Sequence, residues 1–450
     1  MSVVSSGRGR ESDQRTFHEF TSRGAADSAT RRSRRSAGRS LRVVGLFAGI
    51  GGLEHGLSLA GHRTELLCEL DESAFRVLQR QFEGVPVRRD VRKLHGLPAA
   101  TELIVAGFPC QDLSQAGKTA GIEGRSSSLV GEVIRLLRSR RQARRPIPLV
   151  LFENVPFMLH LARGRALEVI ISALEELGYR WAYRVVDTMA FGLPQRRERV
   201  FLVAALDEDP RGILFADRVN QPPPQVPSPS LSYGFYWTEG LRGLGTAVDA
   251  VPTLKGGSTI GIPSPPAIVL PSGDVVLPSI EDAERLQGFE EGWTSPAHEG
   301  GRPSLRWRLV GNAVSVPVAQ WLGGRLADPG HPFEDSWAEP VAKNRSWPRA
   351  AWNCGGGRFG CEIGTWPVAY ERIPLHEFVA STQPLSERAT AGFLARLSRS
   401  NLRRPRWFDE RLAAHLRRMQ QARHREQADG AKQNGSRAKS RAAAASATND

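Results

Sequence analysis

Between Leu41 and Leu206 the chain alternates short apolar runs with stretches in which apolar residues recur every three or four positions. Short continuous apolar runs are typical of strands buried on both faces, and the longer spacing is typical of helices. The pattern predicts strands at 41–47, 65–69, 85–88, 103–107, 149–152, 183–186 and 200–204, and helices at 52–60, 72–82, 129–138 and 166–177. Alternating strands and helices predict an α/β fold, a doubly wound and mostly parallel sheet with helices on both faces.

The alternation ends after Leu206, and the composition changes at the same point. Residues 207–280 are rich in Pro, Gly, Ser and Thr, which predicts a smaller, loop-rich region that we extend to residue 304. We expect residues 305–326 to return to the α/β domain of 41–206 and complete it.

The remaining parts of the chain divide into an extension and two tails. Nine of the ten Trp residues lie at or after Trp237, so we expect a folded carboxy-terminal extension at 327–426. Residues 1–40 and 427–450 lack apolar periodicity and are expected to be disordered.

The formal net charge of +14 is concentrated at the two ends. Residues 1–42 hold ten Arg against four acids, and residues 396–450 hold fourteen Lys and Arg against five acids. Basic tails favour polyanions such as nucleic acid, although tails that only keep a protein in solution would have the same composition.

Composition excludes several classes of protein. The longest apolar runs are far too short to span a bilayer, and the polar, Arg-rich start does not resemble a signal peptide. Four cysteines in 450 residues argue against a disulfide scaffold and for a reducing compartment. We therefore expect a cytoplasmic protein without a membrane segment.

Glycines follow the first predicted strand, in the segment Phe47-Ala48-Gly49-Ile50-Gly51-Gly52. Glycine allows the backbone to turn tightly and to approach a ligand at the carboxyl edge of a parallel sheet. Glu69 ends the second strand and can accept from ribose hydroxyls, and Asp90 follows the third strand and can accept from an adenine amino group. Together they predict an adenosine-containing cofactor, and a purely structural glycine turn is the alternative.

Two more strands lead into reactive side chains. Cys110 follows the strand at 103–107, and Glu153 follows the strand at 149–152. Because the carboxyl ends of parallel strands share one edge, both should lie near the glycine segment. A cysteine there is a candidate nucleophile and Glu153 a candidate acid, whereas a buried apolar cysteine and a helix-capping or ion-paired glutamate are the alternatives. Cys354 and Cys361 make at most half of a zinc site, so no metal is expected.

These segments, taken in order, resemble the DNA (cytosine-5) methyltransferases of the bacterial modification type. The similarity covers 45–320 and comprises the segments 47–52, 69, 90, 107–111 with Ser114 and Gly117, 153–155, 195–199, 285–289 and 311–315. The chain departs from the family pattern at Gly45, where the family often has Asp, and at Glu281, where Arg is common. The segment at 125–129 is one residue longer than its counterpart.

The resemblance implies a fold of the S-adenosylmethionine-dependent methyltransferase type and methyl transfer from S-adenosylmethionine to C5 of a flipped-out cytosine. It implies that Cys110 attacks C6, that protonated Glu153 serves N3, and that Arg199, with Arg197 nearby, serves O2 or orders Glu153. The cofactor residues that it implies are Phe47, Gly49, Ile50, Gly52, Glu69, Leu70, Asp90, Val91, Gly107, Pro109 and Asn312.

The expected partner is double-stranded DNA, with the protein acting as a monomer beside a separately encoded restriction endonuclease and associating with the nucleoid through its substrate. Candidate DNA contacts are Gln111, Ser114, Arg242, Lys255, Ser258 and Thr259, the last four in the region where the family keeps its variable target recognition. One alternative is a tRNA cytosine-5 methyltransferase. Another is a catalytically inactive DNA-binding protein, against which the presence of Cys110, Glu153 and Arg199 argues.

Overall fold

The computed structural model describes residues 38–109, 129–256, 265–298, 304–332, 338–341 and 346–446. Five of the predicted site residues lie outside these ranges, namely Cys110, Gln111, Ser114, Ser258 and Thr259. The expected amino-terminal tail lies outside them up to residue 37.

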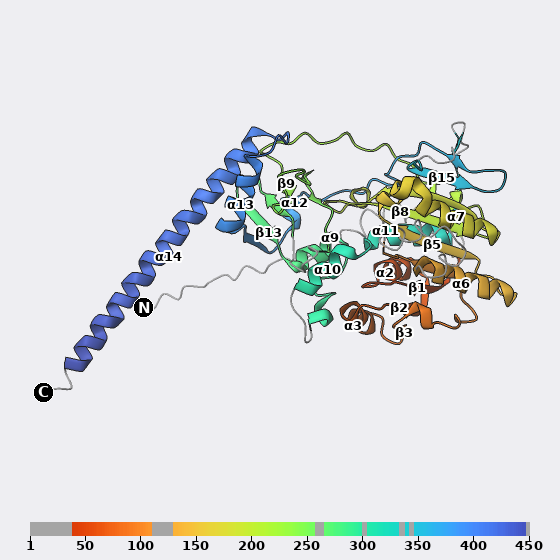
Figure 1. Ribbon diagram of the computed structural model, residues 1–450, viewed down its shortest axis with the longest axis horizontal. Coiled ribbons are helices and arrows are strands. Elements are labelled where there is room, and N and C mark those ends of the chain that lie inside the picture. The colour runs from red at the N-terminus through yellow and green to blue at the C-terminus, as the bar shows by residue number, and fades with distance from the viewer. Residues whose placement is uncertain are drawn as a thin grey trace, which may run out of the picture. The chain divides into compact units, whose positions relative to one another are not determined.

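Ten strands in the described part of the chain form one large sheet (Figure 1). Neighbouring parallel strands run in the order β3-β2-β1-β4-β5, and each lies where the apolar runs predict a strand. Their bounds are Val87–Arg88 for β3, Arg63–Cys68 for β2, Arg42–Leu46 for β1, Leu103–Ala106 for β4 and Leu149–Asn154 for β5. The predicted α/β fold with a mostly parallel sheet is confirmed.

Beyond β5 the sheet continues with β8 (Glu198–Ala205) and then β6 (Arg180–Asp187). β8 runs antiparallel to both of its neighbours. A crossover between parallel strands needs about a dozen residues or more, and only ten residues separate β6 from β8. The short connection therefore forces β8 to reverse direction, which alternation of strand and helix alone did not predict.

Helices cover both faces of the large sheet, as predicted. α6 (Leu129–Gln142) and α7 (Arg165–Glu176) pack on one face, and α2 (Gly52–Leu59) and α11 (Val316–Ala327) pack on the other. α3 (Glu72–Gln81) packs with the segment around Trp293.

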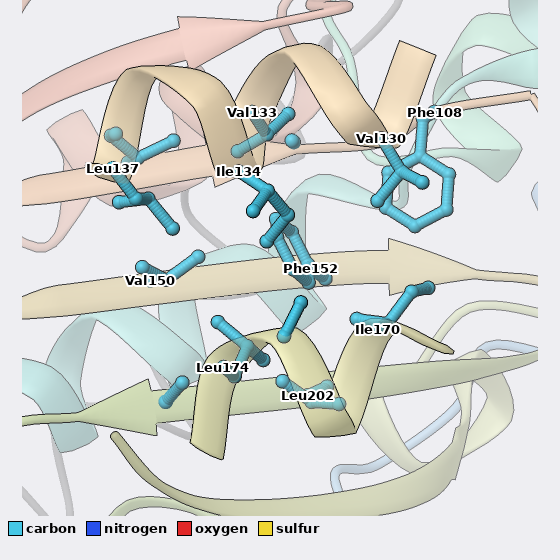
Figure 2. Packing of buried hydrophobic residues seen from close by; sticks show 14 of the residues in the cluster. Phe108, Val130, Val133, Ile134, Leu137, Val150, Phe152, Ile170, Leu174 and Leu202 are labelled. Carbon is cyan, nitrogen blue, oxygen red and sulfur yellow. The ribbon is translucent and has the colours of Figure 1, made fainter. Parts of the chain in front are cut away.

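The central strand β5 shows why its sequence is apolar throughout. Its even-numbered Val150 and Phe152 lie in the cluster with α6 and α7, as Figure 2 shows. Its odd-numbered Leu149 and Leu151 lie in the opposite cluster with α2 and α11. Burial of one such side chain contributes about 1.5–3 kcal/mol, so both faces of this strand favour the folded state.

A second sheet has the strand order β10-β9-β12-β13-β17. Four of its strands come from the predicted loop-rich region, at Ala247–Val248 (β10), Tyr233–Phe235 (β9), Ala267–Val269 (β12) and Val275–Pro278 (β13). The fifth, β17 (Thr382–Pro384), comes from about a hundred residues further along the chain and pairs with β13.

The extension expected at 327–426 does not form a unit of its own, which corrects that part of the domain prediction. Its first half adds β15 (Ala350–Asn353), β16 (Phe359–Gly360) and β14 (Glu339–Pro340) to the large sheet. Its second half adds β17, α13 (Glu387–Leu397) and α14 (Arg406–Ser446) to the small sheet, where Phe393 and Phe408 pack against Phe235. Each half covers a sheet that would otherwise expose apolar surface.

The expected disordered tail at 427–450 is also corrected, because α14 continues through this stretch to Ser446 (Figure 1). Ala, Arg, Lys and Gln make up most of it, and these residues favour helix even when no apolar face requires one. The low complexity of the tail concealed its helix propensity.

The remaining elements connect these layers. Their bounds are Val91–Lys93 (η1), Pro156–Leu159 (η2), Leu161–Gly164 (η3), Thr188–Phe191 (η4), Gln195–Arg196 (β7), Arg211–Leu214 (α8), Val251–Pro252 (β11), Ile280–Leu286 (α9), Ser295–His298 (η5), Ser304–Asn312 (α10) and Leu375–Phe378 (α12). β7 and β11 pair with each other in parallel. No helix in the described ranges combines the length and apolarity needed to cross a membrane.

The packing of α14 on the small sheet predicts the effect of truncating Phe408. This side chain is fully buried against Tyr233, Phe235 and Phe393. Phe408→Ala should lower the free energy of unfolding by about 3–5 kcal/mol. Phe157→Ala, at a position 60% exposed, should change it by less than about 1 kcal/mol. Equal urea midpoints for the two variants would contradict the packing described here.

Candidate active site

The carboxyl ends of β1, β2, β4 and β5 bring the predicted site segments to one edge of the large sheet. The glycine segment follows β1, Glu69 follows β2, Gly107 follows β4, and Glu153 belongs to the end of β5. In doubly wound sheets, ligands bind in the crevice outside this edge. The described chain reaches Pro109, the residue directly before Cys110.

The glycine segment turns sharply through left-handed backbone conformations. Phe47, Gly49 and Gly51 have φ angles of 55°, 56° and 84°. A Cβ on Gly51 would lie 2.3 Å from the Phe82 ring, and one on Gly52 would lie 2.3 Å from the carbonyl oxygen of Val314. A Cβ on Gly49 would meet no described atom within 4 Å. Gly51 and Gly52 therefore permit close packing, whereas Gly49 faces open space suited to a ligand.

Buried groups contact the glycine segment and stabilise its conformation. The Ile50 carbonyl accepts a hydrogen bond from the Trp293 indole at 2.9 Å, and Ile50 itself is buried. The Trp293 ring lies 5.1 Å from the ring of Phe289, tilted by 36°, and Phe289 belongs to the segment 285–289 singled out in the sequence. The late segment thus supports the glycine turn.

Glu69 connects the glycine turn to the second strand. One of its carboxylate oxygens accepts from the backbone N–H of Gly49 and the other from that of Asp71, both at 2.8 Å. Each oxygen keeps a lone pair for a ribose hydroxyl. Burial raises the pKa of Glu69, against the lowering effect of these backbone hydrogen bonds. The next residue, Leu70, is 59% exposed and offers an apolar surface at the same edge.

Asp90 and Val91 lie at the third strand, with Val91 buried. The Asp90 carboxylate accepts from the backbone N–H of Arg92 at 3.0 Å and from its guanidinium at 2.9 Å. Arg92 accordingly lowers the pKa of Asp90. An adenine amino group would share this carboxylate with Arg92. The open side of Gly49, the spare acceptors of Glu69 and the exposed Leu70 fit the adenosine-containing cofactor that the sequence predicts.

Glu153 and Arg199 form a buried ion pair at the end of β5. Arg199 Nε lies 3.0 Å from Glu153 Oε1, and both side chains are almost fully buried. Burial raises the pKa of Glu153 although Arg199 and Arg197 oppose this, and burial lowers the pKa of Arg199. A Cβ on Gly107 would lie 3.3 Å from Glu153 Oε2, so glycine at this position keeps the carboxyl open toward the β4 edge.

Asn154 fixes the segment that leads to Cys110. Its side-chain amide donates to the carbonyl oxygen of Phe108 at 3.0 Å. Phe108 also packs edge-on against Phe152 in the core. The chain therefore leaves β4 along a defined path past Glu153, and Gly107 and the exposed Pro109 lie on that path.

Arg197, the other arginine of this segment, lies close enough to Glu153 for its charge to lower the pKa of that carboxyl. It is 1% exposed. Its guanidinium donates to the carbonyl oxygens of Leu254, Gly311 and Ala313, at 3.2, 3.2 and 2.6 Å. These bonds tie together segments that are far apart in the sequence. Arg197 is a structural residue in this arrangement, whereas Arg199 contacts Glu153.

Two buried glutamines, to which the sequence assigned no role, complete this structural network. Gln195 donates to the carbonyl oxygen of Leu286 at 2.8 Å and accepts from the backbone N–H of Leu254 at 3.1 Å. Gln287 donates to the carbonyl oxygen of Val310 at 2.9 Å and accepts from the Ser315 hydroxyl at 2.7 Å. Their position within segments shared with the family was the available signal.

Glu54 is the other residue that sequence reasoning missed. It is a buried acid in the first turn of α2, and burial raises its pKa from 4.5 to about 8. An acid in the first turn of a helix is ordinarily an exposed group that interacts with the helix dipole, so nothing in the sequence pattern distinguishes Glu54.

The predicted DNA contacts that the structure describes are Arg242 and Lys255. Both are exposed. Lys255 pairs with Glu239 and lies 3.8 Å from the centre of the Tyr236 ring. The exposed Asn312 lies beside the same segment, since a Cβ on Gly256 would come within 2.6 Å of its side-chain oxygen. Lys255 and Asn312 therefore approach each other where the loop-rich region meets the late segment.

Of the remaining cysteines, Cys68 is buried at the end of β2 directly before Glu69, whereas Cys354 follows β15. The Cys354 thiol donates to Asp209 at 3.3 Å, and burial raises its pKa to about 12. Within the described residues, no group of three or more His, Cys, Asp or Glu side chains is arranged to hold a metal ion.

Comparisons with known proteins agree with the geometry. The sequence model of the C-5 cytosine-specific DNA methylases matches residues 41–236. The Type II methyltransferase M2.BsuMI of Bacillus subtilis is 48% identical over 368 residues, which cover 80% of this chain and 94% of that protein. Type II methyltransferase M.BanI of Aneurinibacillus aneurinilyticus is 36% identical over 38% of this chain and 40% of its own length. M.NlaX of Neisseria lactamica is 29% identical over 63% of this chain and 96% of its own length.

The geometry separates a cofactor residue from a residue of the chemical step. Glu69→Ala should weaken S-adenosylmethionine binding about tenfold to a hundredfold, because it removes charge-assisted hydrogen bonds to the ribose and to the glycine turn. Glu153→Gln keeps the size of the side chain and should lower turnover with nearly unchanged cofactor affinity. Calorimetric titration beside single-turnover methylation measures both quantities. The same phenotype in the two variants would contradict the assignment.

Proposed function

This chain belongs to the C-5 cytosine-specific DNA methylases, and we propose that Cys110, Glu153 and Arg199 carry out its methyl transfer. Its activity is DNA cytosine-5 methylation with S-adenosylmethionine as methyl donor, and it is the modification enzyme type of restriction-modification systems. The observation that carries the residue assignment is the buried Glu153–Arg199 pair beside the segment that leads to Cys110.

C5 of cytosine is a weak nucleophile and must be activated before it can accept a methyl group. In our proposal the Cys110 thiolate attacks C6, and the electron pair of the C5–C6 double bond becomes available at C5 while negative charge moves toward N3 and O2. Bound S-adenosylmethionine would supply the methyl group, whose bond to the sulfonium sulfur breaks as the bond to C5 forms and leaves S-adenosylhomocysteine. Loss of the C5 proton then restores the double bond and expels the thiolate.

Glu153 is suited to hold the proton that N3 needs. Burial raises its pKa, which favours the protonated carboxyl, while Arg199 at 3.0 Å fixes its orientation and keeps proton release possible. The guanidinium of Arg199 can also compensate charge at O2. Because the reacting atoms are stacked inside a duplex, the cytosine has to leave the helix to reach this edge.

We assign target recognition to the loop-rich region at 207–304 together with β17, α13 and α14, which complete its sheet. Lys255 supports this assignment, since its segment borders Asn312 at the catalytic edge while its side chain remains half exposed. Arg242, Ser258 and Thr259 in the region and Gln111 and Ser114 after the nucleophile are the further proposed DNA contacts. The α/β domain at 41–206, completed by 305–326, carries catalysis in this proposal.

The proposed setting follows from this activity. The substrate is DNA, and we expect a monomer that acts on duplex DNA in the cytoplasm, associated with the nucleoid through that substrate. A separately encoded restriction endonuclease that cuts the same sequence is the proposed counterpart, since methylation protects host DNA from such a nuclease. The description of the matching family as DNA methylases disfavours the alternative tRNA substrate.

The covalent step can be trapped. Duplex DNA with 5-fluorocytosine at the target should form a stable adduct with the protein, because fluorine cannot leave C5 as a proton does. Cys110→Ala should abolish both the adduct and methyl transfer while it still binds S-adenosylmethionine. Cys354→Ser is the matched control and should form the adduct like the unaltered protein. Full methylation by Cys110→Ala, measured by bisulfite sequencing, would overturn the mechanism.

The basic ends should add DNA affinity that does not depend on sequence. Removing 1–37 and 427–450 deletes eight Arg at the start and Lys432, Arg437, Lys439 and Arg441 at the end. It leaves the contacts of α14 with the small sheet, such as that of His415 with Leu385, in place. The slope of log affinity against log salt should become shallower by about 0.9 for each lost phosphate contact.

The methylated sequence should stay the same in the truncated protein, because phosphate contacts position a protein without reading bases. Replacement of the same four carboxy-terminal basic residues by Gln, with the helix retained, separates the effect of charge from that of length. An unchanged salt slope would assign the ends to solubility alone.

A further inference from the structure

Glu54 places a carboxyl group directly beneath the glycine turn. Its side chain folds back from the first turn of α2 onto Gly45, near the carboxyl end of β1. A Cβ at position 45 would lie 2.1 Å from Glu54 Oε1 and 2.8 Å from its Cδ. The backbone of Gly45 has no positive φ that would require glycine. Gly45 is therefore required by the volume of the Glu54 carboxyl and by no other feature of the strand.

This carboxyl has fewer partners than a buried acid ordinarily has, since a hydrogen bond from its own backbone N–H is the one interaction that lowers its pKa. Glu54 is 1% exposed, and its Oε2 atom has no hydrogen-bond partner among the described residues. Burial of an ionisable group without a partner is costly. Glu69 and Glu153 at the same edge avoid this cost through backbone N–H groups and through Arg199.

The charges around Glu54 do not compensate it either. The charged group that interacts with Glu54 is a second carboxyl, Glu69, and its negative charge raises the pKa of Glu54 further. From β1 it faces Gly45, and α11 packs on α2 through apolar side chains such as Val318 and Leu322. The described surroundings thus supply no cation, and an unpaired acid remains beneath the turn that faces the cofactor site.

We propose that Glu54 is a cofactor-positioning residue whose carboxylate accepts a hydrogen bond from the α-ammonium group of S-adenosylmethionine. The ammonium group is the cation of this cofactor that can donate hydrogen bonds, since the sulfonium has no N–H or O–H. In this arrangement Glu69 accepts hydrogen bonds from the ribose, and Glu54 accepts one from the amino-acid end of the same S-adenosylmethionine molecule. This inference rests on the proposed cofactor site.

A pair of ligands tests the proposal. S-Adenosylhomocysteine contains the ammonium group, whereas 5′-methylthioadenosine has the same adenosine and thioether but lacks the amino-acid end. Glu54→Gln should weaken S-adenosylhomocysteine binding about tenfold to a hundredfold and leave 5′-methylthioadenosine binding unchanged. Glu69→Ala, the matched control, should weaken both ligands. Isothermal titration of the full chain measures all four affinities.

Proton release provides a second readout that a structural role would not change. Glu54 is protonated in the free protein near pH 6.5, since its pKa is raised to about 8. Pairing with an ammonium group requires the carboxylate, so binding of S-adenosylhomocysteine should release close to one proton. Titrations in two buffers of different ionisation enthalpy detect this release, which Glu54→Gln should remove.

A transplanted acid tests whether position or charge matters. Glu54→Ala removes the side chain that fills the space next to Gly45. Adding Gly45→Asp to this variant should place a carboxylate in that space and restore most of the lost affinity for S-adenosylhomocysteine. Gly45→Asp alone should be destabilised, because two side chains then compete for one volume.

Equal S-adenosylhomocysteine affinity in Glu54→Gln and the unaltered protein would overturn the inference, as would equal loss for both ligands or a double variant without recovery. Failure of the unaltered protein to bind either ligand would instead contradict the proposed cofactor site.

Discussion

The reversal of β8 is the constraint on which the active-site edge depends. Because β8 runs antiparallel to β5, its amino end lies at the carboxyl ends of the parallel strands, where the glycine turn and Glu153 also lie. Glu153 pairs in register with Phe201, so Arg199, two residues earlier on the same face, is its diagonal neighbour. A parallel β8 would carry Arg199 to the opposite edge of the sheet. The buried ion pair is thus a direct consequence of strand direction, and strand direction follows from the short connection after β6.

A pair buried in this way needs rigid support, because its attraction offsets the cost of desolvation only when the geometry is maintained. The support comes from the residues just before β8. Arg197 donates to the backbone carbonyls of Leu254 and Gly311. Gln195 accepts from the backbone N–H of Leu254 and donates to the carbonyl oxygen of Leu286. These bonds fix the start of β8 and also attach the loop-rich region to the catalytic edge. The same residues that stabilise the pair therefore hold the proposed reading surface near the proposed chemistry.

The sequence predicted those features that depend on local pattern and on strand ends. Apolar runs located the strands, and the shared edge of parallel strands placed Glu69 and Glu153 at the same edge of the sheet. Features that depend on pairing between distant segments were not predictable. For example, β17 has only three residues and no apolar run that would predict a strand paired with β13. The backbone contacts of Arg197 were not predictable either, since its carbonyl partners at Leu254, Gly311 and Ala313 lie far from it in the sequence. Glu54 escaped notice because its distinguishing property, the space left by Gly45, exists only in three dimensions.

Glu54, Glu69 and Glu153 lie near the same edge of the sheet but differ in the groups that surround their carboxyls. Burial raises the pKa of each, but backbone N–H groups stabilise the charge of Glu69, and Arg199 stabilises that of Glu153. Glu54 has only its own backbone N–H, and its Oε2 atom has no hydrogen-bond partner in the described part of the chain. Because its pKa is higher in the folded than in the unfolded protein, the folded state binds more protons between pH 4.5 and about 8. The contribution of Glu54 to stability is therefore complete below that window and declines as the pH rises through it. A cation that pairs with its carboxylate opposes this effect, so it stabilises the folded state most at the alkaline end of the window, where the carboxylate forms.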